Sequence, residues 1–103
     1  MKIVITERAS KWFKEEMELE QGDYVKFYTQ FYGSSPVQET FSLGFTKDTP
    51  IDPAVSTVAK GIIFFVEESD LWYFAGHDLH VDYNENSDEI EYEYTQSEFD
   101  DEQ

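Results

Sequence analysis

The sequence contains no cysteine and few basic residues. Without thiols it has no disulfide framework, no thiol nucleophile and no redox pair, and it cannot hold zinc or an iron–sulfur cluster through its own thiolates. Only 7 Lys and Arg stand against 23 Asp and Glu, so the formal net charge is −16 at pH 7. Such a surface repels the phosphates of nucleic acids and anionic membranes. It favours a protein partner with a basic surface, although the same charge is also explained by solubility alone.

Long apolar runs are also missing. The N-terminal run is too short for a signal peptide, and no stretch approaches the roughly 18–20 apolar residues of a membrane span. We therefore expect a cytoplasmic protein without a membrane partner. With 103 residues, 40% hydrophobic and 17% aromatic, the chain has the length and core material of one domain. We expect that domain to cover residues 1–95 and to be followed by a frayed acidic tail over 96–103.

The first third of the chain has clear periodic patterns. Residues 2–5 form a short β-branched run, and Thr6 after it is a good helix N-cap. Apolar residues then recur at three- and four-residue spacing, which predicts a long helix over about residues 7–19, capped by Gly22. Residues 24–32 alternate as a strand with aromatics on both sides.

The remaining patterns are shorter. Further strands are predicted at residues 39–45, 62–66, 79–83 and 90–94. Residues 46–59, with Pro50 and Pro53, predict a loop with little regular structure, and residues 70–74 predict a short helix. This order of elements predicts an α+β domain: one long N-terminal helix and one short helix packed against a mainly antiparallel, partly sandwiched sheet.

One group of side chains has metal-ligand chemistry: His77, Asp78, His80 and Asp82. Imidazole with carboxylate suits zinc or non-haem iron. On a strand His80 and Asp82 share a face, whereas His77 points to the opposite one. The candidate metal ligands are therefore His80 and Asp82, with His77 joining them only across a turn. The alternative is that these are ordinary structural or surface side chains.

From Gly61 to the end, the chain has 14 Asp and Glu and no Lys or Arg. Among these acids, Asp88, Glu89, Glu91 and Glu93 precede or alternate with Ile90, Tyr92 and Tyr94. On a strand this gives one carboxylate side and one apolar side. It predicts a docking surface for a basic partner, a weak cation site, or an edge strand that charge protects against aggregation.

An aromatic set accompanies the predicted sheet and short helix: Tyr28, Tyr32, Trp72, Tyr73 and Phe74. Most of these rings are expected in the core. Tyr32 and Trp72 are the candidate partner-binding residues, because exposed aromatics of this kind anchor protein interfaces.

Catalytic patterns are absent from the sequence. Ser34 and Ser35 accompany two histidines, but no nucleophile elbow, phosphate-binding glycine loop or dinucleotide fingerprint occurs. We therefore expect no enzyme activity and no cofactor.

The sequence resembles the HesB-like family, which includes the A-type iron–sulfur carriers, over about residues 1–83. The matching stretches are Ile3-Val4-Ile5-Thr6-Glu7-Arg8-Ala9 with Trp12-Phe13, then residues 27–33, 61–66, 67–74 and 76–83. The resemblance implies the HesB-like fold. It also implies three cluster-binding cysteines, of which the first corresponds here to Ser34 and the other two fall in a tail without cysteine.

Two hypotheses follow. The first is a HesB-like domain that has lost the cluster ligands and acts as a non-catalytic adaptor through protein contacts. The second is a metal-binding protein that uses histidine and carboxylate ligands. The resemblance suggests a homodimer, whereas the net charge opposes close pairing of acidic faces, so monomer and homodimer both stay open.

Overall fold

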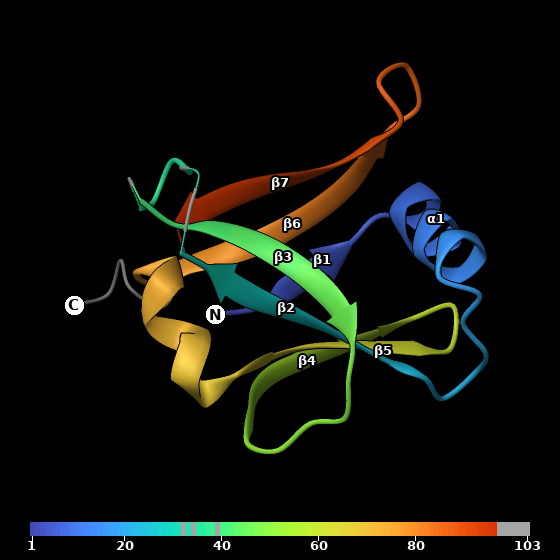
Figure 1. The fold of residues 1–103 in the computed structure, drawn as a ribbon, viewed down its shortest axis with the longest axis horizontal. Coiled ribbons are helices and arrows are strands. Elements are labelled where there is room, and N and C mark those ends of the chain that lie inside the picture. The colour runs from blue at the N-terminus through green and yellow to red at the C-terminus, as the bar shows by residue number, and fades with distance from the viewer. Residues whose placement is uncertain (32, 34, 39, 97–103) are drawn as a thin grey trace.

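The computed structural model describes residues 1–31, 33, 35–38 and 40–96. Within them the chain forms one α-helix, one 3-10 helix and seven strands in two sheets (Figure 1). The elements are β1 (Ile3–Ile5), α1 (Glu7–Glu16), β2 (Tyr24–Gln30), β3 (Ser42–Lys47), β4 (Pro53–Ala59), β5 (Ile62–Glu67), η1 (Glu68–Phe74), β6 (His77–Asn84) and β7 (Glu89–Gln96). The predicted α+β class with one longer and one short helix is confirmed.

Both sheets are mixed, which differs from the mainly antiparallel sheet that the sequence predicted. Sheet A has the order β1-β6-β7 and sheet B the order β3-β2-β5-β4. Neighbours along the chain pair antiparallel in three hairpins, but β1 pairs parallel with β6, and β2 pairs parallel with β5. Parallel pairing needs long crossovers, and the sequence pattern of a strand does not reveal its partner.

Helix α1 closes one end of the space between the sheets. The Thr6 hydroxyl caps it by accepting a hydrogen bond from the Ala9 N–H at 3.2 Å. The helix ends at Glu16, three residues before the predicted end, and Glu18 beyond it has a positive φ of 53°. Phe13 is fully buried, and its ring contacts those of three residues in sheet B: Phe27, Phe45 and Phe64.

The 3-10 helix η1 lies at the opposite end of the molecule from α1 (Figure 1). Its Tyr73 and Phe74 are fully buried. The hydroxyls of Tyr73 and Tyr94 lie 2.9 Å apart, which joins η1 to β7. The aromatic core therefore runs from α1 through the two sheets to η1. Neither helix in the described part of the chain is long and apolar enough to cross a membrane.

The prediction that residues 46–59 form a loop was wrong for their second half. Pro53 begins β4, the edge strand of sheet B, where a missing N–H costs little. The loop before it is held by Glu67, which is 8% exposed and accepts hydrogen bonds from the N–H groups of Ile51 and Asp52.

Other boundaries moved by a few residues. The strand predicted over 24–32 ends at Gln30, and the strand predicted over 39–45 runs from Ser42 to Lys47. Gln96, placed in the predicted tail, is the last residue of β7, and residues 97–103 lie outside the described residues.

We predict that Phe13→Ala lowers the free energy of unfolding by about 3–5 kcal/mol, because it removes a fully buried ring from the centre of the core. Chemical denaturation measures the change. Phe31→Ala is the matched control, since that ring is 78% exposed and its loss should cost within about 0.5 kcal/mol. Equal destabilisation by the two variants would contradict this description of the core.

Candidate functional site

The outer face of sheet A carries a row of exposed carboxylates on β7. Glu89, Glu91 and Glu93 are exposed and alternate with Ile90, Tyr92 and Tyr94, which pack against the core. The predicted division of this strand into a carboxylate side and an apolar side is therefore confirmed. We call Glu89, Glu91 and Glu93 the acidic row.

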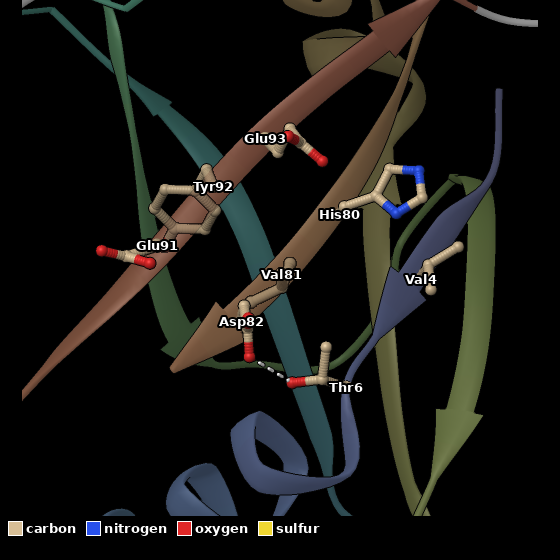
Figure 2. A pocket seen from close by; sticks show the side chains of 8 residues that line it. All are labelled: Val4, Thr6, His80, Val81, Asp82, Glu91, Tyr92 and Glu93. Atoms are coloured by element: carbon tan, nitrogen blue, oxygen red, sulfur yellow. Dashed lines mark hydrogen bonds between the residues drawn. The ribbon is translucent and has the colours of Figure 1, made fainter. Parts of the chain in front are cut away.

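Glu91 and Glu93 of the acidic row border a hollow of about 580 Å³ on the same face. Its lining comprises Val4, Thr6, His80, Val81, Asp82, Glu91, Tyr92 and Glu93 (Figure 2). Strand register explains the grouping, because His80 is paired with both Val4 and Glu93, and Asp82 is paired with Glu91.

Asp82 is the best-bonded carboxylate of this face. Arg8 donates to its two oxygens from Nε and Nη2, both at 2.7 Å, and the Thr6 hydroxyl donates at 2.8 Å. These hydrogen bonds lower the pKa of Asp82 far below its ordinary value of 3.8. The bond from Arg8 is the main cause and the bond from Thr6 the second. Asp82 thus ties the first turn of α1 to β6.

The structure separates His77 from the other two candidate metal ligands. His80 and Asp82 lie on the outer face of β6, as predicted, with Asp82 already bonded to Arg8. The His77 ring points elsewhere, with Nδ1 lying 2.9 Å from the Phe74 carbonyl oxygen. In the part of the chain that the structure describes, no group of three or more His, Asp or Glu is arranged to hold a metal ion. Metal binding by His77, His80 and Asp82 therefore stays a prediction.

Asp88 lies apart from the acidic row, in the turn between β6 and β7. It has a positive φ of 55°, and its carboxylate accepts a hydrogen bond of 2.6 Å from the Tyr83 hydroxyl. That hydrogen bond is the main cause that raises the pKa of Tyr83 to about 12. Asp88 is thus bonded within its own hairpin, although the sequence grouped it with the glutamates of β7.

A second candidate surface is a chain of aromatic rings beside η1. Phe31 is 78% exposed and Trp72 is 51% exposed. The Phe41 ring lies between them, with its centroid 5.1 Å from each of the other two, edge to face. We call Phe31, Phe41 and Trp72 the aromatic cluster. Trp72 is thus exposed, which was the condition for counting it as a candidate partner-binding residue, and that role stays a prediction; Tyr32 and Ser34 lie outside the described residues.

Two members of the aromatic cluster, Phe31 and Phe41, were not predicted as surface residues. In the strand predicted over residues 24–32, alternation puts Phe31 on the same side as Val25 and Phe27, which are buried. The strand ends at Gln30, so Phe31 no longer follows the alternation that carries those rings into the core. Phe41, similarly, precedes β3 by one residue. Both residues lie inside the strands predicted over 24–32 and 39–45 and just outside the observed strands, so the sequence pattern held no signal for their exposure.

We predict that Asp82→Asn destabilises the fold by about 1 kcal/mol at neutral pH, because the carboxylate is partly exposed and its ion pair is screened by solvent. Its folded-state pKa is depressed, so its stabilisation is full above the unfolded-state pKa of 3.8 and is lost as the pH falls towards the folded value. The difference between wild type and variant, from denaturation series at about pH 7, 4 and 2, should therefore shrink with falling pH.

Glu93→Gln is the control for that series, since it removes an exposed carboxylate from the same face. It should change stability little at any pH. A constant difference between wild type and Asp82→Asn down to low pH would contradict the described hydrogen bonds.

Sequence comparisons relate the chain to bacterial proteins of the same size. It is 52% identical over 94 residues to the pyruvate dehydrogenase inhibitor of Bacillus subtilis strain 168, covering 91% of this chain and 99% of that protein. It is 37% identical over 95 residues to an uncharacterised protein of Staphylococcus saprophyticus, covering 89% and 97% of the two chains, and 35% identical to one of Staphylococcus epidermidis with the same coverage. No protein-family model matches the sequence. At this identity over nearly the whole of both chains, the protein belongs to the family of the Bacillus subtilis pyruvate dehydrogenase inhibitor.

Proposed function

We propose that this chain is a non-catalytic regulator that inhibits a pyruvate dehydrogenase by binding to it. The observation that carries the proposal is the 52% identity to the Bacillus subtilis inhibitor across 91% of this chain. It agrees with the hypothesis, drawn from the HesB-like resemblance and the missing cysteines, of a domain that acts through contact with another protein. Inhibition by contact requires no cofactor and no reaction on the inhibitor itself.

The acidic row gives this proposal a physical basis. Glu91 and Glu93 are exposed on a sheet face, within a chain of net charge −16. An array of one sign attracts a surface of the other sign during encounter and raises the rate of association. We therefore propose that the acidic row meets a basic surface of the enzyme.

Titration of the purified enzyme with the chain tests the proposal. We expect pyruvate dehydrogenase activity from the chain's own organism to fall as the chain is added, with a plateau at a fixed ratio of chain to enzyme. The Bacillus subtilis inhibitor on its own enzyme is the positive control. Full activity in the presence of a large excess of chain would refute the proposed function.

The contribution of the acidic row is tested by the double variant Glu91→Lys, Glu93→Lys. We expect it to associate at least about tenfold more slowly, because it converts attraction into repulsion. Glu15→Lys, Glu20→Lys is the matched control, with the same change in net charge at exposed positions on and just after α1. Surface plasmon resonance at low salt measures the rates of association. An equal fall of this rate in both double variants would mean that only the net charge of the chain matters.

We also propose that the fold is HesB-like, with the cluster-binding cysteines lost. The matching stretches from β1 through β6 support this proposal, and Ser34 stands where the family has its first cysteine. Comparison of an experimental structure of this chain with the structure of an A-type carrier tests the proposal. A different strand order in the carrier would rule the relationship out.

A further inference from the structure

We infer that the aromatic cluster of Phe31, Phe41 and Trp72 is the apolar anchor of the inhibitor, which enters an apolar pocket rimmed by Lys and Arg on the pyruvate dehydrogenase. This inference rests on the proposed function and adds the residues that hold the complex together. It concerns the η1 end of the molecule, whereas the acidic row lies on a sheet face.

The fold leaves two of these rings, Phe31 and Trp72, exposed to solvent. Next to Trp72 in η1, Tyr73 and Phe74 are fully buried, whereas Trp72 itself is 51% exposed. Phe31 follows the last residue of β2 and is 78% exposed. Contiguous exposed aromatics of this kind mark interaction sites, and Trp is enriched among the residues that dominate binding energy.

The rings are already ordered by one another. Phe41 contacts Phe31 and Trp72 edge to face, both at a centroid distance of 5.1 Å. Trp72 in turn contacts the buried Tyr73 at 6.2 Å. Because Tyr73 is fixed in the core, the cluster is attached to a rigid support, which reduces the entropy lost on binding.

Charge around the cluster identifies the occupant. The segments that supply the rings contain no Lys or Arg, since none occurs in residues 27–46 or from residue 61 to the end. Helix η1 begins with Glu68 and Asp70. The segments that supply the rings therefore carry acidic side chains and no basic ones, and the complementary site is an apolar pocket with a basic rim.

The same charge argues against a second copy of the chain as the occupant. Two copies docked through their aromatic clusters would bring these acidic segments of both chains together, in molecules of net charge −16 each. Like charges across an interface cost free energy. A basic partner removes this repulsion.

Affinity measurements on two variants test the inference. We expect Trp72→Ala to weaken binding to the enzyme at least about 30-fold and Phe31→Ala about fivefold, as for central anchors of an interface. Ile51→Ala and Val58→Ala are matched controls, because these apolar side chains are 88% and 67% exposed outside the cluster. Both controls should bind within about twofold of wild type. Thermal unfolding of each variant verifies that it is folded. If Trp72→Ala does not fold, the affinity of Phe31→Ala still tests the inference.

Kinetics separate the anchor from the acidic row. Loss of the anchor should raise the rate of dissociation and leave the salt dependence of association unchanged, whereas charge reversal at Glu91 and Glu93 should change that salt dependence. Wild type that binds and inhibits, with both aromatic variants binding as tightly as wild type, would overturn this inference and leave the proposed function standing. Wild type that does not bind would overturn both. Sedimentation of wild type as a dimer that either aromatic variant dissociates would also overturn the inference.

Discussion

The packing of aromatic rings between the two sheets determines which side chains the molecule presents to its surroundings. Phe13, Phe27 and Phe64 are fully buried and contact one another, and Tyr92 packs on Phe27 from the other sheet. Because a strand alternates with a period of two, burial of Ile90, Tyr92 and Tyr94 directs Glu89, Glu91 and Glu93 outwards. The acidic row is thus a consequence of core packing together with the choice of glutamate at every second position.

Different helices cover the two ends of the core between the sheets. At one end α1 inserts Phe13 and is tied to β6 through Asp82, which bonds both Thr6 and Arg8. At the other end η1 inserts Tyr73 and Phe74, and its link to β7 is the pair of tyrosine hydroxyls. A short 3-10 helix that buries two adjacent rings leaves the ring before them outside. The exposure of Trp72 therefore follows from the way η1 closes the core.

The sequence predicted the elements better than their pairing. The alternation of β7, the cap at Thr6 and the common face of His80 and Asp82 depend on neighbours within one segment, and these predictions were confirmed. The parallel pairings of β1 with β6 and of β2 with β5 join distant segments, on which local patterns carry no information. Strand β4 was missed because Pro50 and Pro53 predict a loop, and only its edge position makes a first-residue proline acceptable.

The candidate surfaces illustrate the same limit, since a pattern can reveal a charge but not its partner. Glutamates on β7 were identifiable from spacing alone, whereas the bonding of Asp82 to Arg8 required the fold. The two surfaces also act over different ranges. In the proposed complex, charge on the acidic row would attract the enzyme within about 8 Å at physiological ionic strength, while the rings of Phe31 and Trp72 would gain free energy only when water has left the interface. A small acidic domain that works as proposed would combine fast encounter with slow release, because the two tasks fall to exposed side chains on different parts of the surface.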